Sequence, residues 1–337
     1  MGSKRTTMDD IAKALGISKN AVSLALRGRE GVSEQLRSRV VEAAVSMKYP
    51  GLVQQPVEQY ILALIPRYLG TMEDSAFYQQ VCFHMEAYAQ SRGYQLIISS
   101  VSEAEEEALA QPPLLDNIAC VGVMTIGNLS LPYCRMISKL GLRYLMVDQY
   151  YDELVANSVT TTNTSGAYML TKHLIENGHT SIDYFGKRYT TASLNDRWTG
   201  YSRAMTDYDL VPRRNLYMQD RTSGQHDEHA LIKSAFEAMD TLPTAVFCGH
   251  DNTARAVIDV LASMGAKYPD DISVVGFDDI QHAHVQALKL TTYHTRKADI
   301  AHGAIDLFIE AKDDICRRVL IYGEIIYRDS VRDIRSR

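Results

Sequence analysis

Residues 18–26 read Ser-Lys-Asn-Ala-Val-Ser-Leu-Ala-Leu, and this stretch decides what the first part of the chain forms. The hydroxyl of Ser18 can cap a helix, because Ser is among the residues preferred at a helix amino end. The apolar residues then fall on one helical face, and Lys19, Asn20 and Ser23 lie outside that face. We predict a short helix that buries one side and presents polar groups near its amino end.

Two further helices are predicted on either side of this stretch. Thr7 and Asp10 are spaced as a capping pair that begins a first helix, and Gly16 supplies the left-handed residue that ends it. Ser33 can cap a third helix, whose apolar residues recur at helical spacing. In a helix-turn-helix of this kind the second helix enters the major groove of DNA. The sequence therefore predicts a DNA-binding head over residues 1–50.

Charge separates the head from the rest of the chain. Residues 1–50 hold nine Lys or Arg and five Asp or Glu, a net charge of +4; the whole chain carries −6, so the remainder carries −10. A basic surface attracts phosphates, and an acidic remainder discourages DNA from lying elsewhere on the molecule. An ordinary three-helix domain with scattered Lys is the plainer alternative.

Length and composition indicate a globular protein. The 337 residues are 46% hydrophobic and 23% charged, which suits about two or three domains. No apolar run reaches the roughly 18 residues of a membrane span, so we expect a cytoplasmic, nucleoid-associated protein. The five Cys are widely spaced, and the His pairs at 226–229 and 282–284 lack further ligands nearby. We expect neither disulfides nor a metal site.

From residue 60 onward, apolar runs of strand length alternate with amphipathic helical segments. In the first half, predicted strands lie at 60–65, 94–98, 118–124 and 143–147, with helices near 76–92, 103–110 and 132–140. In the second half, predicted strands lie at 182–185, 216–218, 245–248 and 272–277, with helices at 163–177, 194–208, 227–239 and 252–264. This alternation is typical of parallel sheets between helix layers. We predict two doubly wound parallel-sheet lobes behind a small all-α head.

Polar residues stand where several predicted strands end. Asp148, His250 and Asp278 each follow an apolar run closely, and Arg197 and Trp198 lie near the start of a helix. Ligands of open parallel sheets bind beyond the carboxyl ends of the strands, so these residues would line a cleft between the lobes. Carboxylates, an Arg and an indole suit a polyhydroxylated or carboxylated small molecule. A helix cap or a solvated loop is the alternative for any one of them.

At these residues the chain resembles the lac repressor/galactose repressor (LacI/GalR) family of transcription regulators. The matching stretches are 7–12, 16–23, 32–33, 178–179, 197–201, 270–279 and 290–292. The resemblance covers nearly the whole chain. It implies a homodimeric regulator, most simply a repressor, that reads a near-palindromic operator in double-stranded DNA. It also implies a body like a type I periplasmic binding protein, which senses a small effector, a sugar or a sugar derivative.

The resemblance assigns boundaries and roles. It implies a head at 1–50, a linker or hinge at 51–58, an N-terminal effector lobe at 59–160 and 295–320, and a C-terminal effector lobe at 161–294 and 321–332. Contacts with DNA would come from Thr7, Ser18, Lys19, Asn20, Ser23, Leu24 and Arg27. Contacts with the effector would come from Phe77, Asp148, Arg197, Trp198, His250 and Asp278.

Departures from the family pattern carry information. Leu24 stands where the family has Arg, which removes one DNA contact and offers a thymine methyl an apolar partner. His250 stands where the family has Asn, and a His can carry charge near neutral pH. In the linker, Gly51 and Pro56 leave too few residues for a stable helix. We therefore predict a weakened or absent hinge helix, with less bending of the operator.

Two other functions remain open at this point. The first is a regulator controlled by a protein corepressor that binds the N-terminal lobe. The second is a cytosolic sugar-binding module or an enzyme, but residues 51–337 contain neither a phosphate-binding loop nor a nucleophile elbow. We therefore predict no enzyme activity and no cofactor. The sequence does not say which effector binds, or whether it releases DNA or promotes binding.

Overall fold

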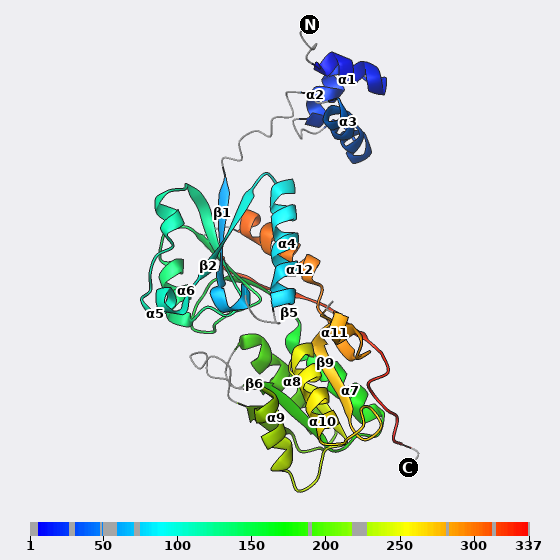
Figure 1. The fold of residues 1–337 in the computed structure, drawn as a ribbon. Coiled ribbons are helices and arrows are strands. Elements are labelled where there is room, and N and C mark those ends of the chain that lie inside the picture. The colour runs from blue at the N-terminus through cyan, green and yellow to red at the C-terminus, as the bar shows by residue number, and fades with distance from the viewer. Residues whose placement is uncertain are drawn as a thin grey trace. The chain divides into compact units, whose positions relative to one another are not determined.

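The computed structural model describes residues 6–26, 31–47, 49, 59–70, 75–187, 191–217, 228–280, 283–311 and 315–335. The chain divides into two compact units, residues 1–58 and residues 59–337 (Figure 1). The first unit contains the head, and we call the second unit the body.

Three helices form the head, as predicted: α1 (Met8–Leu15), α2 (Lys19–Leu26) and α3 (Glu34–Ser46). A capping box begins α1, in which the Asp10 backbone amide donates to the Thr7 hydroxyl and the Thr7 amide donates to the Asp10 carboxylate at 2.8 Å. Gly16 ends α1 in the left-handed conformation, with φ of 67°. The hydroxyl groups of Ser18 and Ser33 accept from backbone amides three residues ahead, at 3.1 and 3.3 Å. All three predicted caps are confirmed.

The body contains two six-stranded sheets. The first sheet has the order β11-β5-β4-β3-β1-β2, with every neighbouring pair parallel. Its strands are β1 (Tyr60–Pro66), β2 (Gln95–Val101), β3 (Cys120–Ile126), β4 (Arg143–Val147), β5 (Asn157–Thr161) and β11 (Arg318–Ile321). Its helices are α4 (Ser75–Ser91), α5 (Glu103–Glu107), α6 (Leu131–Ser138) and α12 (Lys297–Glu310), with 3₁₀ turns η2 (Arg67–Gly70) and η3 (Pro113–Asp116).

The second sheet has the order β12-β10-β9-β8-β6-β7 and is parallel except for the β10–β12 pair. Its strands are β6 (Ile182–Lys187), β7 (Arg213–Tyr217), β8 (Ala245–Cys248), β9 (Ser273–Asp278), β10 (Thr291–His294) and β12 (Glu324–Ile326). Its helices are α7 (Asn163–Glu176), α8 (Ala192–Asp207), α9 (Glu228–Glu237), α10 (Asp251–Ser263) and α11 (Ala283–Gln286).

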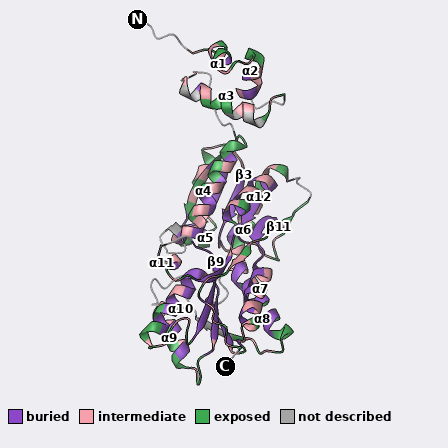
Figure 2. Cartoon of the chain, turned by 90° about the vertical axis from the view of Figure 1, so that its right-hand side faces the viewer, coloured by how far each residue is buried: buried purple, intermediate pink, exposed green. Residues whose placement is uncertain are grey.

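Both faces of the first sheet are buried. Ile61 and Ala63 of β1 pack on one face with α4 and α12, whereas Leu62 and Leu64 pack on the other face with α6. The strands accordingly lie buried inside helix layers (Figure 2). Consecutive residues of a strand point to opposite faces, so a run that is apolar throughout belongs to a sheet covered twice. The prediction of doubly wound α/β lobes is confirmed.

The chain passes between the two sheets three times. The crossings lie between β5 and α7, between β10 and α12, and between β11 and β12. The Tyr293 hydroxyl joins two of them, because it lies 2.8 Å from the Thr162 hydroxyl and accepts from the Gly323 amide at 2.7 Å. Polar strand ends of both sheets are therefore held near the same three crossings.

Candidate effector site and DNA-binding face

Arg197 of α8 and Asp278 at the end of β9 form a buried ion pair. Two guanidinium nitrogens of Arg197 donate to the two carboxylate oxygens of Asp278, at 3.0 and 2.9 Å. The residues are only 4% and 7% exposed. Burial alone would lower the pKa of Arg197, but the Asp278 carboxylate outweighs it and raises that pKa. The bidentate geometry fixes the guanidinium plane as well as its charge.

Further contacts hold this pair in place. Arg197 also donates to the Asn163 side-chain oxygen at 2.9 Å and to the Gly249 carbonyl at 2.7 Å. Its guanidinium carbon lies 3.9 Å from the centre of the Phe277 ring. The Thr295 hydroxyl donates to Asp278 at 3.1 Å. Strand ends and helix starts of the second sheet thus assemble one rigid polar group.

Local backbone geometry explains how these side chains meet. Gly200 lets α8 approach α7 closely, because a Cβ there would collide with the Thr164 carbonyl oxygen. Asp148, Asp278 and Asp279 have φ values of 57°, 100° and 46°. Residues other than Gly rarely adopt such values, and strained residues of this kind cluster at binding sites.

Asp148 lies at the carboxyl end of the first sheet, directly after β4. The Tyr78 hydroxyl of α4 donates to one of its carboxylate oxygens at 3.0 Å. Burial, reinforced by the charge of Asp278 and opposed by that of Arg197, raises the pKa of Asp148 to about 7. These charges couple the end of the first sheet to the ion pair of the second.

Several buried polar atoms at these strand ends have no hydrogen-bond partner among the described residues. They include Asp148 Oδ1, Gln149 Oε1, Asn163 Nδ2 and Ser193 Oγ. Each of the four residues is less than 10% exposed. Buried polar atoms are almost always hydrogen-bonded in native proteins, so each of these atoms is available to a ligand that reaches it.

Lys297, the first residue of α12, connects the two sheets at a crossing. Its ammonium group donates to the Asp278 carbonyl at 2.6 Å, and it lies 5.6 Å from the centre of the Phe77 ring. Burial lowers the pKa of Lys297. Phe77 is itself buried among core residues of the first sheet. Lys297, Tyr78 and Asn163 were not among the predicted site residues.

A second connection lies beside Arg197. The Tyr150 hydroxyl, just after β4, donates to Asp196 of α8 at 2.8 Å. The guanidinium of Arg318 on β11 lies 3.5 Å from the centre of the Tyr150 ring. Burial raises the pKa of Asp196. The residue preceding Arg197 is therefore tied to the first sheet.

Two predicted effector residues have structural partners. His250 caps α10 through its Nδ1 atom, which accepts from the Thr253 amide at 3.2 Å. Trp198 packs against Tyr184 and Tyr201, with ring centroids 5.4 and 5.3 Å apart. Asp251, the first residue of α10, accepts from the Ile280 amide and the Thr292 hydroxyl. The contacts of His250 and Trp198 thus lie within the part of the body that contains the second sheet.

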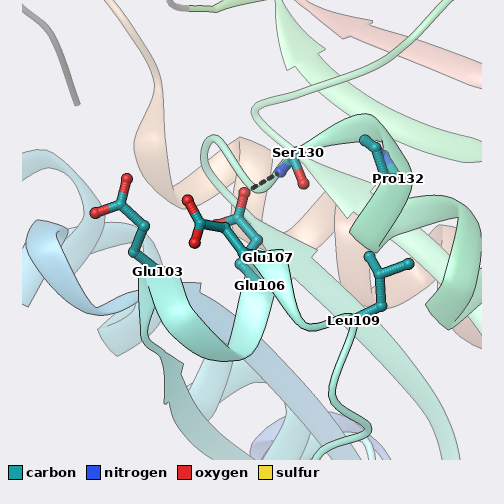
Figure 3. A pocket seen from close by; sticks show the side chains of 6 residues that line it. All are labelled: Glu103, Glu106, Glu107, Leu109, Ser130 and Pro132. Carbon is teal, nitrogen blue, oxygen red and sulfur yellow. Dashed lines mark hydrogen bonds between the residues drawn. The ribbon is translucent and has the colours of Figure 1, made fainter. Parts of the chain in front are cut away.

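A surface hollow lies elsewhere, between α5 and the start of α6 (Figure 3). Its lining is acidic, and the Ser130 amide donates to Glu106 at 2.9 Å. None of the predicted effector residues lines it. In the part of the chain that the structure describes, no three His, Cys, Asp or Glu side chains gather as a metal ion would require. Residues 226, 227 and 282 of the two His pairs lie outside that part.

The predicted DNA contacts that the structure describes lie at the start of α1 and along α2. Lys19 and Asn20 are exposed, whereas Ser23 and Leu24 are partly buried. Ser18 is also exposed, although its hydroxyl serves as the helix cap. Arg27 and the linker at 51–58 lie outside the described residues, and so does the prediction about the hinge helix. Thr7 is exposed at the start of α1.

Comparison with known proteins finds a family match in each of the two units. Residues 7–50 match the family described as bacterial regulatory proteins, lacI family, and residues 171–331 match the periplasmic binding protein-like domain. The HTH-type transcriptional repressor PurR of Vibrio campbellii is 27% identical over 334 residues, which cover 97% of this chain and 99% of that protein.

Two solved structures are similar over nearly the whole chain. The lac repressor dimer bound to operator and the anti-inducer ONPF has a TM-score of 0.68 at 19% identity, covering 98% of this chain and 100% of that one. The complex of the transcriptional regulator CelR with cellobiose has a TM-score of 0.67 at 19% identity, covering 97% and 100%. At this identity the likeness concerns the fold.

A helix-turn-helix head joined to a two-lobed α/β body with a buried polar junction defines a class of protein, the DNA-binding transcription regulator with an effector-binding domain. The matches and the likeness to PurR identify a lacI-family helix-turn-helix domain joined to a periplasmic binding protein-like domain. Among the described residues, no helix is both long and apolar enough to span a membrane.

Proposed function

We propose that this regulator is a repressor whose effector is a neutral, polyhydroxylated small molecule, a sugar or a sugar derivative, bound where the carboxyl ends of the two sheets meet. The observation that carries the proposal is the set of buried, unpartnered polar atoms there. Asp148 Oδ1 and Gln149 Oε1 accept hydrogen bonds, whereas Asn163 Nδ2 donates them. A sugar hydroxyl both donates and accepts, so it can pair with either kind.

Charge at this junction favours a neutral ligand. The Arg197 and Asp278 charges already satisfy one another, and four N–H groups of the guanidinium have partners. His250 Nδ1 is occupied by a hydrogen bond from the Thr253 backbone amide. The buried Lys297 ammonium donates to the carbonyls of Asp278, Asp279 and Thr295, so none of its three N–H groups is left for an anionic ligand. The similar CelR structure is a complex with cellobiose, which supports the same ligand class.

We also infer a homodimer that presents two heads to a near-palindromic operator in the cytoplasm. The similar lac repressor structure is a dimer on its operator, and two-fold symmetric proteins read two-fold symmetric sites. Because a ligand shifts DNA affinity only through its different affinities for two states, binding and regulation must be measured together.

Calorimetry with a panel of mono- and disaccharides tests the ligand class. We expect one of them to bind the wild type, and Asp278→Asn to weaken it by at least about tenfold, because Asp278 holds the Arg197 guanidinium that in turn positions Asn163. The matched control is Glu103→Gln in the surface hollow, which should leave sugar affinity unchanged. If Glu103→Gln weakened sugar binding and Asp278→Asn did not, the binding site would lie in the surface hollow. If the protein binds its operator but none of the sugars, the proposed ligand class is wrong.

A further inference from the structure

An ion pair joins the first two helices of the head. The Lys19 ammonium lies 2.7 Å from Asp9 Oδ2, and both side chains are exposed, at 61% and 53%. Lys19 is the first residue of α2, and Asp9 belongs to the first turn of α1. This pair therefore lies at the amino end of the helix that enters the major groove.

The position of Asp9 is fixed by its own helix. The capping box of Thr7 and Asp10 anchors the first turn of α1, which holds Asp9 between them. A cation at the amino end of a helix is opposed by the helix dipole, and the first turn of α2 has no acidic residue. Asp9 supplies the missing negative charge from the neighbouring helix and raises the pKa of Lys19.

Lys19 in this pair retains unused donors. An ammonium group has three N–H donors, of which one is directed to Asp9. Two remain, and guanine presents two acceptors in the major groove, O6 and N7. Next to O6 the paired cytosine presents its N4 amino group, a donor that a carboxylate can accept. The neighbouring cation and anion therefore match the order of acceptors and donor on a G·C pair.

We propose that Asp9 and Lys19 together read one G·C base pair of the operator, with Lys19 donating to the guanine and Asp9 accepting from the cytosine amino group. This rests on the proposed DNA contact of Lys19 and adds Asp9 as a specificity-determining residue. An A·T pair fits less well, because its keto oxygen lies on thymine beside a methyl group, away from the purine N7. A Lys without Asp9 would read only the guanine.

The test uses the full-length protein and an operator selected from random DNA. The base pair in question is the one whose preference disappears when the selection is repeated with Lys19→Ala. Fluorescence anisotropy at fixed salt then compares this operator with copies carrying A·T, or guanine paired with N4-methylcytosine, at that position. The methyl group blocks the N–H that Asp9 accepts and leaves the guanine acceptors in place.

We expect N4-methylcytosine to weaken wild-type binding about tenfold and to leave Asp9→Ala binding nearly unchanged. The matched control is Glu42→Ala, which removes a charge of the same sign from an exposed position on α3 and should behave as wild type. Asp9→Asn gives a second readout, a shift of preference towards adenine, because Asn pairs with adenine N6 and N7. Thermal melting followed by circular dichroism checks that each head is folded.

Either of two results would overturn the proposal: wild type indifferent to N4-methylcytosine, or Asp9→Ala as sensitive to it as wild type. In both cases sequence-specific binding would persist, so the proposed function would stand. A wild-type protein that selects no DNA sequence would overturn both together.

Discussion

The two sheets end differently at the point where they meet. At the end of the second sheet, Arg197 and Asp278 are bound to each other and to Asn163, Gly249 and Thr295. At the end of the first sheet, one oxygen of the Asp148 carboxylate accepts from Tyr78, and the other, Oδ1, has no well-formed hydrogen bond among the described residues although Ser193 lies close enough to lower the pKa of Asp148. The side formed by the Arg197–Asp278 ion pair is therefore complete before a ligand arrives, whereas Asp148, like Asn163 and Ser193 beside the pair, keeps a polar atom that a ligand can satisfy.

The largest effect on stability should come from breaking the Arg197–Asp278 ion pair at the end of the second sheet. Arg197→Ala leaves the buried Asp278 carboxylate without its cation, and we expect a loss of about 3–5 kcal/mol in the free energy of unfolding. Urea denaturation measures it. Lys172→Ala, which breaks an exposed pair with Glu176, is the control and should cost about 0.5 kcal/mol or less. A loss below about 1 kcal/mol with Arg197→Ala would show that the two sheet ends do not differ as described.

A smaller effect on stability, which depends on pH, should come from Asp148 at the end of the first sheet. The pKa of Asp148 is raised in the folded protein to about 7. Its contribution to stability is therefore fully present below the unfolded-state value of about 4 and is lost as the pH rises through 7. Asp148→Asn removes that loss, so the variant should match wild type near pH 4 and exceed it at pH 8 by up to about 4 kcal/mol.

Denaturation midpoints between pH 4 and pH 8 check this prediction. Asp251, whose pKa burial also raises to about 7, remains in the variant and should preserve part of the slope. Asp240→Asn, at an exposed position, is the control and should follow the wild-type profile. If the stability of Asp148→Asn falls with rising pH as steeply as that of wild type, burial does not raise the pKa of Asp148.

The smallest effect on stability should come from Ser193→Ala. The Ser193 hydroxyl is buried and lies near the Asp148 carboxylate, whose pKa it lowers, without a well-formed hydrogen bond to it, so its removal should change the free energy of unfolding by no more than about 1 kcal/mol. The same change should weaken effector binding measurably in calorimetry, because a donor for the ligand is lost. A clear loss of stability with unchanged affinity would mean that Ser193 serves the fold and not the ligand.

Much of the fold could be predicted from sequence because its signals are local. The capping box at Thr7, the left-handed Gly16 and the apolar run of β4 each depend on residues a few positions apart. β5 was missed because four of its five residues are polar although all five are buried. Periodicity assigns buried strands by apolar character, so it cannot recognise a strand whose side chains make hydrogen bonds at a crossing between sheets.

The candidate site was predictable only in part. Asp148, Arg197 and Asp278 stand out as charges at the ends of apolar elements, and the structure brings them together at the junction of the sheets. Tyr78 and Lys297 give no such signal, because each lies inside or beside a helix whose other residues explain its presence. Trp198 is next to Arg197 in the sequence, but helical geometry turns adjacent residues to different faces, and the Trp198 ring packs on Tyr184.

By itself the sequence determined the class of each part: a capped three-helix head, two alternating α/β lobes and a contrast of charge between head and remainder. These properties depend on near neighbours and on composition. Only the tertiary structure decided the partners, because Asp278 lies 81 residues from Arg197 and Lys19 lies 10 residues and one turn from Asp9. Strand order and helix packing set such distances, and no local pattern in the sequence specifies them.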